Sequence, residues 1–203
     1  HGNRFMKLNS ISSKAAGMHD YIVRNHSDHE ELMNAKFNQG DIISTMITCS
    51  NGETVLIKLD TTLPRFYSRD FTVHGTRGLY SELNNALILD GEYKEEWNHN
   101  YWNNAEAALE KYDHPIWEQF IADGVRGGHG GMDGLVYTAF ITSVLNGWDM
   151  PINVYDAATW MSITALSEQS IANGGAPVAF PDFTRGKWKL PDTPKNPGPY
   201  HIN

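Results

Sequence analysis

Two runs of alternating apolar and polar side chains, separated by Asn51-Gly52, stand out in the first third of the chain. In residues 43–49 one set of alternate positions holds Ile43, Thr45, Ile47 and Cys49, and in residues 55–60 it holds Val55, Ile57 and Leu59, which matches the two-residue period of a β-strand. An Asn-Gly pair between two such runs is a strong hairpin signal, because both central residues of a type I′ turn need positive φ. The pattern therefore predicts an antiparallel hairpin over residues 41–62.

Weaker strand patterns lie on both sides of this hairpin. Residues 5–12 alternate weakly and lead into a short predicted helix near residues 15–24. Further strands are predicted at residues 70–74, 78–83 and 86–90, and the connections between them are short enough to force antiparallel neighbours. Together these runs predict an open, mostly antiparallel β-sheet.

After the strands, the pattern becomes that of helices. A short helix is predicted over residues 105–111, and a second begins at His114-Pro115 because proline suits the first helical turn. Two longer helices follow over residues 132–146 and 154–172, and Asn153 is the predicted N-cap of the last one. Strands followed by helices are typical of an α+β fold, with the helices packed on one face of the sheet.

The chain of 203 residues, 40% of them apolar, is predicted to form one α+β domain over residues 1–203. Residues 177–203 hold six of the nine prolines and are expected to form an extended proline-rich tail. The glycine fingerprint Gly-x-Gly-x-x-Gly does not follow a strand anywhere in the sequence, so we expect no Rossmann domain in this chain.

Charge and cysteine content narrow the classes of function. The chain has 16 Lys and Arg against 24 Asp and Glu, a net charge of −8, without a basic run. This balance repels phosphate backbones and anionic lipid, so we expect neither nucleic-acid binding nor membrane binding. The single Cys49 excludes an internal disulfide and is expected to be a buried, inert thiol. Residues 26–30 are rich in His, Asp and Glu but are expected to be a solvated helix end, so no metal site is predicted.

Residues 126–134, Arg-Gly-Gly-His-Gly-Gly-Met-Asp-Gly, place His129 and Asp133 within a run of five glycines just before a predicted helix. Glycine clusters accommodate positive φ or a close approach of the backbone to a ligand. A helix N-terminus also presents free N–H groups to polar or anionic ligands. We interpret the cluster as part of a binding site. A flexible linker between two helices is the alternative.

Residues 62–69, Thr-Leu-Pro-Arg-Phe-Tyr-Ser-Arg, interrupt the strands with a proline, two arginines and two aromatic residues. The functional interpretation places Arg65 and Tyr67 at the end of a sheet, facing a pocket. Tyrosine offers an apolar face to a sugar ring and a hydroxyl to its polar groups, while arginine offers a rigid fork of donors. An ordinary surface crossover is the alternative.

Several ordered motifs resemble the C-terminal domain of the Gfo/Idh/MocA group of NAD(P)-dependent sugar oxidoreductases. Within that group the closest resemblance is to family 109 of the glycoside hydrolases, the NAD-dependent α-N-acetylgalactosaminidases. The motifs are residues 2–5, 64–69, 127–133, 151–160, 166–171 and 177–188.

The resemblance implies that this chain is the substrate-binding and oligomerisation part of a longer enzyme. It implies a missing N-terminal nucleotide-binding domain that holds NAD, and no cofactor bound by this chain itself. Tyr67 matches the position of the family's substrate-binding tyrosine, and His129, Arg65 and Asp133 are predicted to line the same pocket. The family's catalytic Tyr-x-x-His segment would precede His1, so no catalytic residue is predicted here. The resemblance also suggests a homodimer and a periplasmic or exported protein.

The mechanism that the resemblance implies is oxidation at C3 of an N-acetylhexosaminide, elimination of the glycosidic oxygen, hydration and reduction. Such a route needs no pair of carboxylates at glycosidase spacing, and no spacing in this sequence selects such a pair. Two alternatives stay open. The parent could be a net sugar or cyclitol dehydrogenase, or the chain could be a dimerisation or binding module without chemistry of its own.

Overall fold

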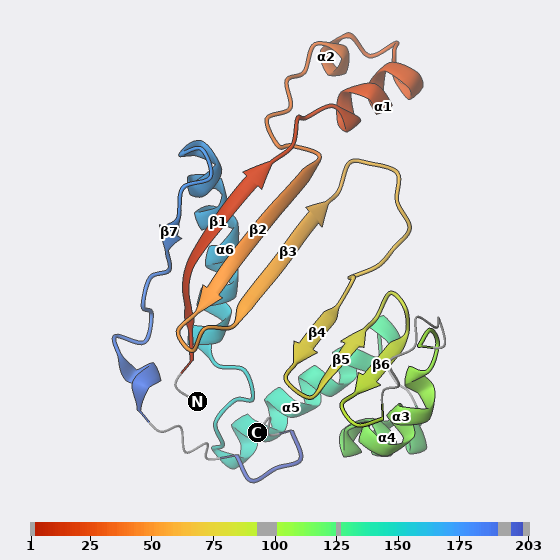
Figure 1. Ribbon diagram of the computed structural model, residues 1–203, viewed down its shortest axis with the longest axis vertical. Coiled ribbons are helices and arrows are strands. Elements are labelled where there is room, and N and C mark those ends of the chain that lie inside the picture. Colours follow the sequence, from red (N-terminus) through yellow and green to blue (C-terminus); the bar gives the residue numbers. More distant parts are fainter. Residues whose placement is uncertain (1–2, 93–100, 125–126, 191–195, 201–203) are drawn as a thin grey trace. The chain divides into compact units, whose positions relative to one another are not determined.

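The computed structural model of this chain (Figure 1) describes residues 3–92, 101–124, 127–190 and 196–200. The chain divides into two compact units. The first unit comprises residues 1–64 and 141–203, and the second comprises residues 65–140. Each unit has its own antiparallel sheet, so the fold is α+β, as the sequence predicts.

The sheet of the first unit has the strand order β3-β2-β1-β7, and every neighbouring pair is antiparallel. Its bounds are Phe5–Ser12 for β1, Ile42–Cys49 for β2, Thr54–Asp60 for β3 and Val178–Ala179 for β7. The predicted hairpin is confirmed as β2 and β3, but its turn is not type I′. Gly52 has φ +97°, whereas Asn51 does not have positive φ. The Asn3 side chain, which accepts a hydrogen bond from the Asn51 amide at 3.3 Å, holds the turn from outside the hairpin.

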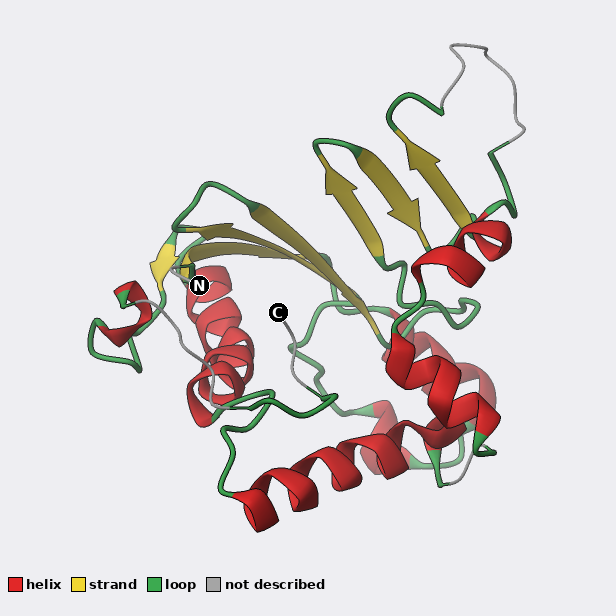
Figure 2. Cartoon of the chain, turned by 90° about the horizontal axis from the view of Figure 1, so that it is seen from below, coloured by secondary structure: helices red, strands yellow, loops and turns green. Residues whose placement is uncertain are grey.

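Helix α6 (Val154–Ala172) runs along one face of this sheet (Figures 1 and 2). Leu8, Ile47 and Phe180 form the buried centre of the core between them. Partly buried apolar side chains surround this centre, namely Phe5, Val55, Ile57, Ile163, Leu166 and Val178. The alternation of the strands thus directs one set of side chains into the core, and the helix begins at the predicted cap, Asn153, which accepts from the Tyr155 and Asp156 amides.

A second part of the same interface consists of hydroxyl groups. The Ser10 and Thr45 hydroxyls lie 2.7 Å apart on neighbouring strands, and Thr45 lies 3.3 Å from the Ser167 hydroxyl of α6. Ser170 of α6 accepts a hydrogen bond from the Ser10 amide at 2.9 Å and donates one to the Ala176 carbonyl at 2.7 Å. We call Ser10, Thr45, Ser167 and Ser170 the hydroxyl seam. All four are buried, and each has its polar atoms satisfied within the interface.

The connection from β1 to β2 contains two short helices, α1 (Gly17–Asn25) and α2 (Glu30–Met33) (Figure 1). The sequence predicts α1 but not α2, which has only four residues. Asp41, just before β2, accepts hydrogen bonds from the Ala16 and Gly17 amides at 2.9 Å each. It also accepts a bond from the Thr62 hydroxyl at 2.6 Å. One carboxylate therefore joins the start of α1 to the segment that leaves β3.

The second unit holds a three-stranded sheet of order β4-β5-β6 with helices after it. The bounds are Thr72–Gly75 for β4, Gly78–Ser81 for β5, Ala86–Leu89 for β6, Ala105–Tyr112 for α3 and Pro115–Ala122 for α4. The Asn104 side chain donates to the Leu87 carbonyl and accepts from the Leu87 amide, both at 2.8 Å, which ties the start of α3 to β6. Helix α5 (Met132–Asn146) follows the glycine cluster.

The sequence pattern predicted a single sheet, and this detail was wrong: the strands form two sheets. Residues 61–71, all of them described, form neither helix nor strand. Pro64 lacks a backbone donor, and Asp70 has φ +49°, so neither suits a regular ladder. The two halves of the strand pattern are therefore separated by an irregular segment.

Within the proline-rich tail, residues 178–182 contact β1 and Arg4, whereas Asn196 donates to the Ser143 hydroxyl at 3.3 Å and to the Asp149 carbonyl at 2.8 Å. Val178 pairs with Leu8, and the helical turn η2 (Lys187–Lys189) follows. Arg4 donates to the Phe180 carbonyl at 2.9 Å and pairs with Asp182 at 3.2 Å. Pro191 and Pro194 of the predicted tail lie outside the described residues.

Candidate functional site

The glycine cluster of the second unit forms a tight turn that runs straight into α5. Gly127, Gly130 and Gly131 have φ of +98°, +67° and +94°, a region that L side chains rarely adopt. His129 itself has φ +51° and begins a single helical turn, η1 (His129–Gly131). The cluster is thus required by the backbone path at three positions, and Arg126 of the same motif lies outside the described residues.

His129 and Asp133 are brought together at this turn. The Nδ1 atom of His129 lies 2.9 Å from the Oδ2 atom of Asp133. The imidazole is 80% exposed and the carboxylate 45% exposed. A carboxylate accepts a hydrogen bond and cannot donate one when ionised, so Nδ1 carries the proton and Nε2 of the neutral ring is left as an acceptor. The pair can therefore orient a proton acceptor toward a ligand.

Gly128 makes room for this pair. A Cβ atom at residue 128 would lie 2.7 Å from the Oδ2 atom of Asp133, closer than real Cβ atoms are found. Gly128 has φ −72°, which any residue can adopt. A side chain at position 128 would therefore displace the Asp133 carboxylate from its place beside His129, although the backbone conformation would accept it.

The second predicted element, residues 62–69, belongs to the irregular segment. Tyr67 is 83% exposed and Phe66 is 71% exposed. Two large aromatic side chains are thus presented to solvent by a segment with no ladder of its own. Exposed aromatic residues on a loop that a rigid scaffold holds are typical of binding sites.

Carboxylates hold this segment at both of its ends. At the first end, Thr62 donates to Asp41 as described above. At the other end, Glu82 accepts from the Phe71 amide at 3.0 Å and lies 3.7 Å from the Nε atom of Arg69. The Glu82 amide in turn donates to the Phe71 carbonyl at 2.8 Å. Sequence reasoning missed the roles of Asp41 and Glu82, because each acts on residues at least 11 positions away along the chain.

Of the four predicted site residues, the structure joins His129 to Asp133 and places Arg65 and Tyr67 on the irregular segment. All four belong to the second unit. Among the described residues, neither a hydrogen bond nor a ring contact links Tyr67 to His129. That these two side chains face one pocket stays a prediction.

Two motifs that lie far apart in the sequence meet in the first unit. Arg4, from the first motif, pairs with Asp182 from the last one, and its guanidinium lies 5.7 Å from the centre of the Trp188 ring. Asp182 also accepts from the Trp188 indole at 3.2 Å and from Thr184. The Thr184 hydroxyl is the main reason that the pKa of Asp182 lies below its usual value. These motifs are thus structural, whereas those at residues 64–69 and 127–133 present exposed groups.

The described residues contain no cluster of three or more His, Cys, Asp or Glu side chains that could hold a metal ion. In the same part of the chain, no helix is long and apolar enough to cross a lipid bilayer. Cys49 is half-buried rather than fully buried, and burial raises the pKa of its thiol. A raised pKa keeps the thiol protonated and unreactive.

A family model described as "Glycosyl hydrolase 109, C-terminal domain" matches residues 1–190. This chain belongs to glycosyl hydrolase family 109. The match covers both units of the fold, including the turn with His129 and the segment with Tyr67.

Relatives from several bacteria are similar to the chain over nearly its whole length. A "Glycosyl hydrolase family 109 protein" of Stenotrophomonas maltophilia is 42% identical over 189 residues, which cover 93% of this chain and 41% of the relative. Proteins named "Alpha-N-acetylgalactosaminidase" from Tannerella forsythia and Shewanella oneidensis are 41% and 35% identical over 187 and 189 residues. The two aligned regions cover 92% and 93% of this chain, and 39% and 41% of the Tannerella and Shewanella proteins, respectively. The chain thus spans about two fifths of the length of these relatives.

Proposed function

We propose that this chain is the substrate-binding part of an NAD-dependent glycosidase that acts on N-acetylhexosaminides by oxidation, elimination, hydration and reduction. The observation that carries the proposal is the family match over residues 1–190, together with relatives named for α-N-acetylgalactosaminidase activity. The exposed Tyr67 and the His129–Asp133 pair supply groups suited to a sugar.

The described residues do not fit NAD itself. Both sheets are antiparallel, whereas the dinucleotide-binding fold needs parallel strands joined through helices. The glycine cluster follows helix α4 and not a strand, so it lacks the setting of a pyrophosphate-binding turn. We therefore place the cofactor on a nucleotide-binding domain outside this chain and assign no cofactor step to the residues described here.

What this chain contributes in the proposal is binding and orientation of the sugar. The Tyr67 ring offers a face to the C–H groups of the pyranose, and its hydroxyl can bond to a ring substituent. The Nε2 atom of His129, kept as an acceptor by Asp133, can accept a proton from a sugar hydroxyl or bind it. Arg65 is assigned to the acetamido or hydroxyl oxygens because arginine donates only.

The test compares two proteins with an aryl N-acetyl-α-galactosaminide as substrate. The first is this chain alone, for which we expect no turnover because the cofactor-binding part is absent from it. The second is a polypeptide that carries this chain behind a nucleotide-binding domain, for which we expect hydrolysis that depends on bound NAD. Net accumulation of NADH with the sugar would instead make the parent a dehydrogenase. Turnover by the isolated chain would contradict the proposal that this chain binds the sugar while a separate domain binds the cofactor.

A further inference from the structure

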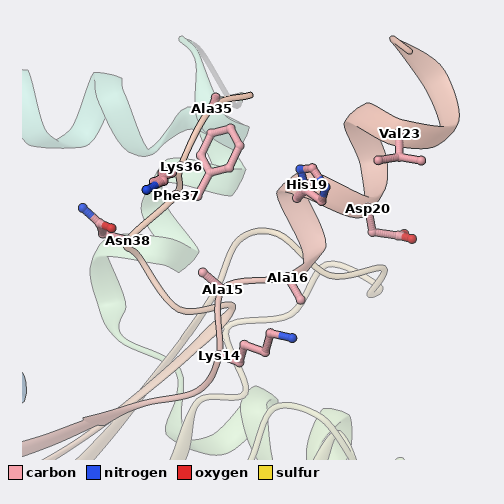
Figure 3. Close-up of a pocket in the computed structure, with 10 residues that line it drawn as sticks. All are labelled: Lys14, Ala15, Ala16, His19, Asp20, Val23, Ala35, Lys36, Phe37 and Asn38. Carbon is pink, nitrogen blue, oxygen red and sulfur yellow. The ribbon is translucent and has the colours of Figure 1, made fainter. Parts of the chain in front are cut away.

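A pocket of about 560 Å³ lies in the first unit, between α1 and the strand-free segment of residues 35–38 (Figure 3). It is separate from the segment of Tyr67 and from the glycine cluster, since it is lined only by residues 14–38. Its size is within the range of small-ligand sites, which is about 300–1,000 Å³.

Two rings define the sides of this pocket. Figure 3 shows the imidazole of His19, from α1, opposite the phenyl ring of Phe37, from the segment of residues 35–38. Phe37 is 38% exposed, and among the described residues its ring stacks on no other ring. Small apolar side chains complete the wall at Ala15, Ala16 and Val23. The hollow therefore offers a partly exposed aromatic ring, the kind of surface against which the C–H face of a sugar ring packs.

Two of the five polar side chains that line the pocket are lysines. Lys14 and Lys36 line it, and within the described part of the chain their ammonium groups form no hydrogen bond or ion pair. Asp20, the one acidic residue of the lining, is already paired with Arg24 at 2.6 Å. The pocket therefore carries local positive charge in a protein whose net charge is −8. It selects for a ligand that carries negative charge.

We propose that this pocket is a second carbohydrate-binding site, which holds an acidic sugar residue of the glycan whose terminal sugar the enzyme processes. The sugar ring packs against Phe37, and its carboxylate pairs with one lysine of the lining, Lys14 or Lys36. The choice of a saccharide as the ligand rests on the proposed function, whereas the preference for an acidic one rests on the charges of the pocket. The site would favour acidic glycans over neutral ones without touching the bond that is cleaved.

Two monosaccharides that differ only at one carbon test the proposal: D-galacturonate carries a carboxylate where D-galactose carries a hydroxymethyl group. We would follow amide chemical shifts of the ¹⁵N-labelled chain during titration with each sugar. Galacturonate is expected to shift the signals of His19, Phe37 and Asn38 and to bind about tenfold more tightly than galactose, as expected for one charge-assisted bond.

Variants locate the site. Replacing the lysine that pairs with the carboxylate, by Lys14→Gln or by Lys36→Gln, should weaken galacturonate binding severalfold and leave galactose unaffected, while Phe37→Ala should weaken both sugars. Lys58→Gln, on the exposed strand β3, is the matched control and should change neither. Unchanged far-ultraviolet circular dichroism and an unchanged thermal midpoint show that each variant is folded.

Equal affinity for the two sugars, or galacturonate binding that survives both lysine substitutions, would overturn the proposal. Titration with N-acetylgalactosamine separates it from the proposed function. Shifts at Tyr67 or His129 at N-acetylgalactosamine concentrations too low to shift Phe37 would support the proposed function, because the pocket binds neutral sugars only weakly. Galacturonate shifts at Phe37 combined with no hydrolysis by the longer enzyme would support the pocket and contradict the glycosidase.

Discussion

At the scale of single residues, four carboxylates fix the backbone of this molecule. Asp41 and Glu82 hold the two ends of the irregular segment, Asp133 orients His129, and Asp182 binds Arg4 and Trp188. Each accepts hydrogen bonds from groups that would otherwise stay unpaired when the chain folds. Such bonds to an ionised acceptor are stronger than bonds between neutral groups.

The stability of the first unit is expected to depend on the ionisation of Asp41. The Thr62 hydroxyl, followed by the Gly17 and Ala16 amides, holds the pKa of Asp41 below its usual value of 3.8, while burial acts in the opposite direction. A lowered folded-state pKa contributes stability that is fully present above the unfolded pKa and is lost as the pH falls through the folded one.

Asp41→Asn should therefore lower the free energy of unfolding near neutral pH, and its deficit relative to the unsubstituted chain should shrink as the pH falls below 3.8. Urea unfolding at a series of pH values measures this. Asp28→Asn is the control, because Asp28 is exposed and its side chain forms no hydrogen bond or ion pair within the described residues. A deficit that stays constant down to strongly acidic pH would show that the carboxylate charge is not involved.

His129 provides a second prediction at this scale. In the unsubstituted chain at alkaline pH we expect the Nδ1–H tautomer, because Asp133 accepts from that atom at 2.9 Å. Asp133→Ala should return the ring to the Nε2–H tautomer that free imidazole favours. The ¹⁵N chemical shifts of the two ring nitrogens distinguish the tautomers. His74, on strand β4, serves as an internal control, and an unchanged His129 spectrum in the variant would contradict the assigned role.

At the scale of elements, the irregular segment of residues 61–71 is held by carboxylates at its ends and exposes aromatic side chains in its middle. Thr62 and Phe71 are bonded to carboxylates, whereas the Tyr67 side chain between them is 83% exposed. This arrangement limits the path of the backbone while leaving the aromatic side chains available to a ligand.

Glu82→Ala is expected to loosen the second end of the segment. The substitution removes the acceptor of the Phe71 amide at 3.0 Å and the ion pair with Arg69 at 3.7 Å. Hydrogen exchange of the Phe71 amide should become faster, by roughly tenfold if one hydrogen bond is lost, while amides of α6 keep their rates. Glu106→Ala, on the exposed side of α3, should leave the Phe71 amide unchanged. If Glu82→Ala also leaves it unchanged, the end is held by other contacts.

The features that the sequence predicted correctly are local ones. The hairpin follows from alternation around Gly52, and the start of α6 follows from Asn153 and Asp156, which form a reciprocal capping box within four residues. The bond from His129 to Asp133 is also local, because it joins residues one helical turn apart, but the sequence pattern did not predict it. Each of these depends on neighbours that a short stretch of sequence contains.

The features that could not be predicted depend on distant residues. The turn of the hairpin is set by Asn3, 48 positions before Asn51, and not by the Asn-Gly pair alone. The bond from Thr62 to Asp41 closes a loop of 21 residues, and no periodicity reveals which carboxylate will close it. The separation of the strands into two sheets also depends on distant residues, because alternation specifies a strand but not the strand with which it pairs.

At the scale of the whole molecule, the open face of the first sheet is available for association. Ile11, Met46 and Leu56 point away from α6, since their strand neighbours Ser10, Thr45 and Ile57 pack toward it. They are 66%, 43% and 67% exposed. Apolar side chains of this size on an open sheet favour contact with another protein surface.

We expect the chain to form a homodimer through this face. Leu56→Glu would place a charge in the centre of the contact and should weaken the dimer at least tenfold, because a buried unpaired charge is strongly unfavourable. Light scattering over a range of protein concentrations measures the change. Met161→Glu is the control, since Met161 lies on α6 and is 76% exposed. A chain that is monomeric at high micromolar concentration would refute the dimer.

The hydroxyl seam has a mechanical consequence for the first unit. Two apolar surfaces can slide past each other by a residue with little change in buried area, because dispersion contacts have no preferred direction. Hydrogen bonds do have a preferred direction. A shift of α6 along β1 would leave the buried hydroxyl oxygens of Ser10, Thr45 and Ser170 without hydrogen-bond partners. The hydroxyl seam therefore holds α6 in a single register against the sheet. These hydrogen bonds resist sliding of α6 along the sheet, which the apolar packing of the core alone would permit.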